Sequence, residues 1–464
     1  MLNCARTGCL AALLVVVPTL AADWTNSGGN GGRNGQTSEL GPDAADLLWS
    51  GGRTSIIAWQ PVTAGRRVFV VRQNAFIPNN VPNDSPVVCM NLDTGAEEWI
   101  RHIPYNSGDW TAWIAGVSNG KVYAGRSGNG ASVSAKLHAL NQATGATEWV
   151  STDTVDAGPY DGVVFADNGD LVVASFRAIK RIRAADGTTA WTANRLGSVS
   201  GNCGGARHGG AIYVADAVAG GNAIKKYDLA TGAFLYQSPT LAGFTIQNTP
   251  MVSPDGTVYL SRVQNNAGVD FFYAINDSGS GMTVRWSKPA HWTTSSEFAV
   301  SPLDSSVYMV APGRVIERRA ASDGTLINSA APIDIEFGSG PRMAVDSQGR
   351  LFVGNGSFGT GRMYSFNADL TPRWSVAVPN INIGGPAIGE DGTLVLAGVG
   401  TNIRAYRTER CAADFDGDGF VTGIDFDLYV AAFEAGDLSA DFDGDGFITG
   451  IDFDLYVAAY ETGC

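Results

Sequence analysis

Short runs in which apolar and polar residues alternate recur along most of the chain. The alternation has the period of two residues that is typical of β-strands, and each run follows a turn rich in glycine or serine. The runs recur at a spacing of roughly 40 to 55 residues, which is the period expected for the blades of a β-propeller. Eight runs occur, and they start at Gly65, Gly120, Gly169, Gly210, Gly256, Ser305, Gly349 and Gly392.

Most of these runs are followed by a second run, a tight turn and an aromatic residue. Residues 138–149, "HALNQATGATEW", are the clearest copy. The last run, residues 392–407, has no aromatic strand after it, whereas "DLLWS" at residues 46–50 supplies one near the N-terminus. We therefore predict an all-β, eight-bladed propeller in which this N-terminal strand completes the last blade and removes the exposed sheet edges.

Residues 411–464 form a different region, in which one acidic phrase occurs twice. "DFDGDGFVTGIDFDLYVAAFE" begins at Asp414, and a near copy begins at Asp441. This tail has 13 acidic residues and no Lys or Arg, so it carries nearly all of the net charge of −14. The near-neutral remainder has no run of basic residues, which argues against nucleic acid as a partner.

Both acidic phrases have the ligand spacing of a calcium-binding EF-hand loop. Carboxylates stand at loop positions 1, 3 and 5, glycine at 6 permits the sharp turn, and oxygen ligands follow at 7, 9 and 12. Both copies have Asp at position 12, where Glu is usual. We predict that each loop binds one Ca²⁺ ion. The ligands are Asp414, Asp416, Asp418, Phe420, Thr422 and Asp425 in the first loop, and Asp441, Asp443, Asp445, Phe447, Thr449 and Asp452 in the second.

A helix is expected after each loop, and two cysteines enclose the whole tail. The apolar residues after the first loop predict one apolar helical face, formed by Ile424, Phe426, Leu428, Tyr429 and Phe433. Cys411 and Cys464 lie at the two ends of the tail, and we predict a disulfide between them. The tail is thus expected to be a small α-helical domain that is stabilised by metal and disulfide.

The N-terminus has the features of an export signal. Arg6 precedes a short apolar run, residues 9–17, and small residues near Ala21 and Ala22 offer a cleavage site. We expect a signal peptide at residues 1–22, a propeller at 23–410 and the acidic domain at 411–464. The protein is then secreted, periplasmic or on the cell surface, where disulfides can form. No later run is long enough to span a membrane, and we expect Cys89 and Cys203 to be small buried residues.

The repeat motif resembles that of the quinoprotein-type (PQQ-like) β-propellers. The motif Ala-x-Asn-x-x-Thr-Gly-x-x-x-Trp is complete at residues 139–149. The resemblance implies that the aromatic residue docks between adjacent blades. The alcohol dehydrogenases of that family bind PQQ and Ca²⁺ in the funnel of the ring and typically add a vicinal cysteine pair. This chain has no adjacent cysteines, so PQQ is not expected here.

The tail resembles a type I dockerin, because two loop–helix units occur without helices that enter the loops. This resemblance implies two bound Ca²⁺ ions and docking onto a cohesin-like protein partner. Loop positions 10 and 11, which read the partner in dockerins, correspond to Gly423 and Ile424 in the first half and to Gly450 and Ile451 in the second. Because the two halves are identical here, two docking orientations related by a two-fold axis are expected.

These observations favour an exported, non-catalytic propeller that binds a polysaccharide or protein and is attached to a partner through its calcium-binding tail. A carbohydrate-active enzyme is the alternative, because dockerins accompany polysaccharide-degrading domains, and Asp161 and Glu297 are then candidate funnel carboxylates. A quinoprotein dehydrogenase ranks third. The four histidines are scattered without metal-ligand spacing. The glycine-rich stretch at residues 29–32 lacks the Lys-Ser/Thr of a phosphate loop, so a turn is expected there.

Overall fold

A computed structural model describes most of the chain, namely residues 23–52, 60–72, 86–104, 109–128, 134–156, 162–195, 204–241, 249–262, 271–291, 298–334, 342–357, 359–408, 411–416, 420–443 and 446–463. The chain folds into two compact units, residues 1–407 and 408–464. The first unit is built of β-strands and the second of helices.

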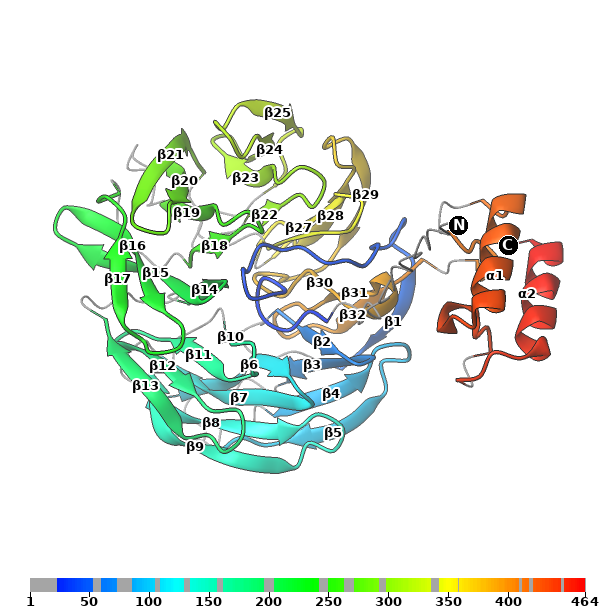
Figure 1. Ribbon diagram of the computed structural model, residues 1–464, viewed down its shortest axis with the longest axis horizontal. Coiled ribbons are helices and arrows are strands. Elements are labelled where there is room, and N and C mark those ends of the chain that lie inside the picture. The colour runs from blue at the N-terminus through cyan, green and yellow to red at the C-terminus, as the bar shows by residue number, and fades with distance from the viewer. Residues whose placement is uncertain are drawn as a thin grey trace, which may run out of the picture. The chain divides into compact units, whose positions relative to one another are not determined.

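The first unit is an eight-bladed β-propeller, as predicted from the sequence (Figure 1). In the described residues, each blade is an antiparallel sheet of four strands. The first four sheets, each given from its innermost strand outward, are β2 (Val62–Ala64), β3 (Arg67–Val71), β4 (Val87–Asn91) and β5 (Glu97–Arg101); β6 (Asp109–Ser118), β7 (Lys121–Gly128), β8 (Ser134–Asn141) and β9 (Thr147–Asp156); β10 (Val164–Phe165), β11 (Leu171–Ala174), β12 (Ala178–Ile182) and β13 (Thr189–Asn194); and β14 (Gly205–His208), β15 (Ala211–Val218), β16 (Gly221–Asp228) and β17 (Phe234–Gln237). The last four are β18 (Met251–Val252), β19 (Val258–Arg262), β20 (Phe271–Asp277) and β21 (Met282–Pro289); β22 (Ala299–Val300), β23 (Val307–Ala311), β24 (Val315–Arg319) and β25 (Leu326–Ser329); β26 (Met343–Val345), β27 (Leu351–Gly354), β28 (Arg362–Phe366) and β29 (Pro372–Ala377); and β30 (Ala387–Ile388), β31 (Leu394–Leu396), β32 (Ile403–Tyr406) and β1 (Leu47–Gly51).

The eighth sheet closes the ring by combining the two ends of the propeller. Its outer strand β1 pairs antiparallel with β32, and Trp49 lies opposite Ala405. This confirms the predicted N-terminal closure. Because β1 completes the eighth sheet, all eight sheets have four strands, and the closed ring leaves only short, protected sheet edges.

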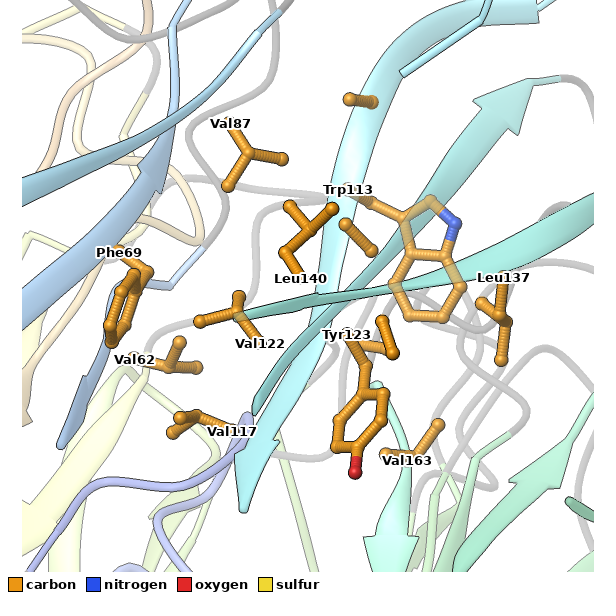
Figure 2. Packing of buried hydrophobic residues seen from close by; sticks show 14 of the residues in the cluster. Val62, Phe69, Val87, Trp113, Val117, Val122, Tyr123, Leu137, Leu140 and Val163 are labelled. Carbon is orange, nitrogen blue, oxygen red and sulfur yellow. The ribbon is translucent and has the colours of Figure 1, made fainter. Parts of the chain in front are cut away.

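Tryptophans of five outer strands dock their sheets onto a glycine in a turn of the next sheet. The Trp99 ring covers Gly145, where a Cβ would lie 2.6 Å from the ring, and its Nε1 donates to the carbonyl of Gln142 at 3.0 Å. Trp49, Trp149, Trp191 and Trp286 repeat this arrangement on Gly95, Gly187, Gly232 and Gly324. Apolar side chains of neighbouring sheets fill the space beneath, as Figure 2 shows for Phe69, Trp113, Tyr123 and Val163.

Three junctions differ. On the outer strand of the seventh sheet, Trp374 donates to the carbonyl of Pro42 at 3.3 Å, and two other junctions have no outer-strand tryptophan and use polar contacts instead. At the junction of the fourth and fifth sheets, Tyr236 and Lys226 donate to the Asp277 carboxylate at 2.6 and 2.8 Å. Burial opposes ionisation of this carboxyl, but these hydrogen bonds prevail and lower the pKa of Asp277 to about 2. At the junction of the sixth and seventh sheets, Tyr308 and Arg318 donate to the carbonyl of Ala368 at 3.1 and 2.8 Å.

Residues 23–41, here called the axial segment, lie inside the ring (Figure 1). Six backbone carbonyls of this segment accept hydrogen bonds of 2.7 to 3.0 Å from N–H groups of six innermost strands. The donors are Thr63, Val117, Arg207, Val252, Val300 and Val345, and the acceptors, in the same order, are Trp24, Thr25, Gly31, Gly32, Asn34 and Gly35. Since both series rise along the chain, the segment passes around the axis in the order of the sheets.

The second unit contains two loop–helix repeats. Helix α1 (Gly423–Ala435) and helix α2 (Gly450–Thr462) have the same length, and a short 3-10 turn, Leu438–Ala440, lies between them. A buried cluster of Ala413, Tyr429, Ala440 and Tyr456 forms the centre of this unit.

The docking of tryptophan on glycine can be tested with two glycines of the second sheet. Gly145 and Gly120 both have positive φ, at 66° and 71°, but a Cβ at Gly120 would meet nothing within 4 Å. Both Gly→Ala changes strain the backbone by about 1–2 kcal/mol. Gly145→Ala must also displace the Trp99 ring, so we expect an additional loss of about 1–3 kcal/mol.

Chemical denaturation of the two variants measures this difference. Equal free energies of unfolding for Gly145→Ala and Gly120→Ala would show that the ring does not depend on this contact.

Candidate functional site: two acidic loops

The last carboxylate of each acidic loop lies in the first turn of the helix that follows it. In the first repeat, Thr422 is the N-cap of α1 and forms a capping box with Asp425, a pattern that stabilises helix starts. Asp425 is fully buried, and it accepts hydrogen bonds from the backbone N–H groups of Asp416 at 3.0 Å and Thr422 at 2.8 Å. These donors lower the pKa of the Asp425 carboxyl, which keeps it ionised and fixes it beneath the loop.

The second repeat has the same construction. Thr449 caps α2 and forms a capping box with the buried Asp452. Asp452 accepts hydrogen bonds from the backbone N–H groups of Thr449 at 2.7 Å, Phe442 at 2.8 Å and Asp443 at 3.1 Å. These donors lower the pKa of the Asp452 carboxyl as well.

The folded loops bring the predicted carboxylates together. Oxygen atoms of Asp414, Asp416 and Asp425 lie within 4.8 Å of one another, as do those of Asp441, Asp443 and Asp452. Three carboxylates at this separation can share one cation, and oxygen-only ligands suit Ca²⁺ or Mg²⁺. Asp418 and Asp445, the predicted ligands at position 5, lie outside the described residues.

A two-fold pseudosymmetry relates the two repeats. Tyr429 and Tyr456 stack with ring centroids 3.7 Å apart and an interplanar angle of 4°. The Tyr429 hydroxyl donates to the carbonyl of Ala440, and the Tyr456 hydroxyl donates to that of Ala413, both at 3.2 Å. Each tyrosine therefore binds the chain just before the other repeat's loop, so the two clusters support one another.

The predicted single apolar face of the first helix is wrong. Tyr429 is buried, and Phe426 and Phe433 pack in part against the core, but Ile424 and Leu428 are 61% and 43% exposed. The second helix repeats this arrangement, because Ile451 and Leu455 are exposed to the same extents. Each helix therefore exposes one pair of apolar side chains to solvent. Phe420 and Phe447, in the loops before the two helices, are exposed as well.

These exposed residues include two of the predicted docking residues. Ile424 and Ile451 hold equivalent places in the first turns of the two helices, next to Gly423 and Gly450. An apolar groove of about 880 Å³ between the helices includes the docking residue Ile451 and is also lined by Phe426, Val430, Phe433 and Phe453 among others.

Cys411 is disulfide-bonded, in agreement with a covalent closure of this unit. Its predicted partner Cys464 lies outside the described residues, so the pairing stays a prediction. Cys89 is a free, fully buried thiol, and burial raises its pKa to about 12. This matches the packing role expected for it, whereas Cys203 lies outside the described residues.

The remaining candidates from the sequence belong to the propeller. In the part of the propeller that the structure describes, no three carboxylate, His or Cys side chains are grouped closely enough to share a metal ion. Asp161 and Glu297, the candidate funnel carboxylates, lie outside the described residues.

The comparisons with known proteins concern the propeller. A family model described as "Outer membrane protein assembly factor BamB" matches residues 83–326, and the chain belongs to this family of PQQ-type β-propellers. A comparison with curated proteins finds no match. The acidic tail lies outside the matched residues, and among the described residues no helix is long and apolar enough to cross a bilayer.

Solved structures share the ring. A quinohemoprotein alcohol dehydrogenase from Comamonas testosteroni aligns with a TM-score of 0.57 and 12% identity over 84% of this chain and 81% of the other. BamB from Moraxella catarrhalis aligns with a TM-score of 0.51 and 14% identity over 78% of this chain and 97% of the other. The quinohemoprotein alcohol dehydrogenase ADHIIG from Pseudomonas putida HK5 aligns with a TM-score of 0.56 and 13% identity over 83% of this chain and 80% of the other. At these identities the similarity concerns the fold and not the activity.

The sequence did not reveal the axial segment. The turns expected at residues 29–32 are present, but the same residues also hydrogen-bond to the innermost strands. The only hint of this segment in the sequence was the stretch after Trp24, which is rich in Gly and Asn and has no periodic pattern of apolar residues. Backbone carbonyls make most of these contacts, and they leave no side-chain pattern to read.

The disulfide can be mapped directly. We expect unreduced protein, once digested, to yield one peptide pair that links Cys411 to Cys464 and separates on reduction. Mass spectrometry checks this, and alkylation of both cysteines without prior reduction would contradict it.

Proposed function

We propose that this protein is an exported, non-catalytic binding propeller whose C-terminal unit binds two Ca²⁺ ions and attaches the protein to a partner protein. The observation that carries the proposal is the duplicated acidic cluster, each copy next to the same set of exposed apolar residues. A fold stabilised by two ions could present these residues in a fixed arrangement.

The charges support a structural role for the metal. Residues 411–464 of this unit include 13 acidic residues and no Lys or Arg, so in the absence of cations the carboxylates repel one another within each loop. A unit of this size, residues 408–464, also buries little apolar surface. A divalent cation in each loop removes the repulsion and couples ion binding to folding.

The same charges define the partner that would bind. Even two bound divalent cations leave the unit strongly negative, so two copies of this chain repel each other at this surface. A complementary partner has an apolar patch for Ile424 or Ile451 and basic residues around it. The resemblance to dockerins names a cohesin-like protein as such a partner, and the pseudosymmetry supports binding in either of two orientations.

The family description supports a binding function. The family description is that of an assembly factor for outer membrane proteins, which is a function in handling proteins. On this basis the propeller presents a protein- or polysaccharide-binding surface outside the cytoplasm, as the expected signal peptide at residues 1–22 also indicates.

Removal of calcium tests the metal part of the proposal. Scanning calorimetry of the full protein should give two transitions, of which chelation lowers only the one that belongs to the C-terminal unit. A single site at 100 times its Kd contributes about 2.7 kcal/mol. Asp414→Ala with Asp441→Ala should abolish this calcium-dependent stabilisation and leave the propeller transition in place.

Asp427→Ala with Asp454→Ala is the matched control. It removes the same charge from exposed helix positions outside the two clusters, so calcium should still stabilise it. A chelator that moves neither transition in the parent protein would exclude a structural calcium, and one that moves both would reveal a metal site in the propeller.

The docking surface is tested with the full-length protein immobilised. Extracellular protein from the source organism should yield a component that is retained with Ca²⁺ and released by chelator. Ile424→Asp with Ile451→Asp should lose it, because each change places a charge in the proposed apolar contact. Leu326→Asp, at a leucine of the propeller that is 47% exposed, should retain it. Equal retention by both variants would place the contact elsewhere.

A further inference from the structure

The innermost strand of each propeller sheet has one edge that faces the axis and pairs with no further strand of its sheet. Backbone N–H groups at such an edge must bind water, a ligand or another part of the chain. In this protein, N–H groups of six innermost strands bind carbonyls of the axial segment. The segment thus takes the place that a ligand could occupy along the axis.

Side chains extend these contacts to the remaining two sheets. Asn26 donates to the carbonyl of Val163 at 2.9 Å and so reaches the third sheet. The Gln60 side chain accepts from Gly28 N–H at 3.1 Å and donates to the carbonyl of Pro386 next to the eighth sheet. Every sheet of the ring is therefore connected to the segment.

Arg33 fixes the centre of the segment. It is 2% exposed, and its guanidinium donates to the carbonyls of Gly205, Ser27 and Gly162 at 2.7, 2.7 and 2.9 Å. These hydrogen bonds join the third and fourth sheets to the segment. Arg342 of the seventh sheet donates to the Ser27 hydroxyl at 2.7 Å. A segment held in this way is part of the folded ring rather than a loose end.

The segment lies so close to the strands that no further group fits between them. A Cβ at Gly32 would lie 2.5 Å from the carbonyl oxygen of Val252. A Cβ at Gly35 would lie 2.9 Å from the Cβ of Ala299. Most of the six donors lie just before the turn that joins the first and second strands of their sheet, so the segment fills the axis at that end of the ring.

We propose that the axial segment is a permanent internal ligand that plugs this end of the propeller, and that it excludes a prosthetic group of the PQQ type from the axis there. PQQ is a planar quinone with three carboxylates, and it would need an open, flat space and cationic or metal partners. The buried Arg33 guanidinium instead binds backbone carbonyls of the chain itself. This proposal is independent of calcium binding by the C-terminal unit.

Amide hydrogen exchange of the full-length protein tests the plug. Peptides that cover the ends of β6, β14, β18, β22 and β26 should be protected in the parent protein. Gly32→Ala should push the segment away from Val252 and make exchange at β18 and β22 at least about tenfold faster, because those amides lose their acceptors. Gly31→Ala is the control, since a Cβ there would lie 3.8 Å from its nearest neighbour, an ordinary contact.

Exchange as slow in Gly32→Ala as in Gly31→Ala would overturn the plug. Equilibrium dialysis of the parent protein against PQQ and Ca²⁺ tests the second half of the proposal and requires no variant. We expect no saturable binding. PQQ that binds while the innermost strands keep their protection would show that the axis holds both, and it would refute the exclusion.

Discussion

A ring of sheets has two sets of backbone groups to satisfy, at the joint where the ring closes and at the edges that face the axis. The N-terminal residues of the described chain satisfy both sets. Residues 47–51 complete the eighth sheet by pairing with β32, and residues 24–35 bind the inner edges of six sheets. Because an unpaired buried N–H group costs about 1–3 kcal/mol, this one stretch of chain supports the whole propeller.

The C-terminal unit depends on a different constraint. The first turns of its helices contain Asp425 and Asp452, whose carboxylates are held by backbone N–H groups of the loops. The stacked tyrosines join the two repeats through carbonyls that precede the opposite loop. Loop, cap and core are therefore one structure, and a change of charge in either loop reaches the centre of the unit.

The sequence predicts the parts of the structure in which side chains carry the information. Alternating strands, the tryptophans on most of the outer strands and the spare strand at Trp49 predicted the number of blades and their closure. The spacing of carboxylates predicted which ones gather in each loop. The axial segment could not be predicted, because most of its contacts are made by backbone carbonyls, which leave no pattern of side chains in the sequence. The exposed side of each helix was also misjudged, since almost every position around α1 is apolar or small and periodicity cannot tell which side faces the core.

The closure between β1 and β32 also sets an order of events in time. Residues 24–51 are made before any of their partners, and the last of these partners, β32, is made only after seven sheets have been completed. The contacts that close the ring therefore have the highest contact order in the molecule, and contacts of this kind form late and slowly. Until then, β1 has no partner strand in its sheet and is open to pairing with other chains.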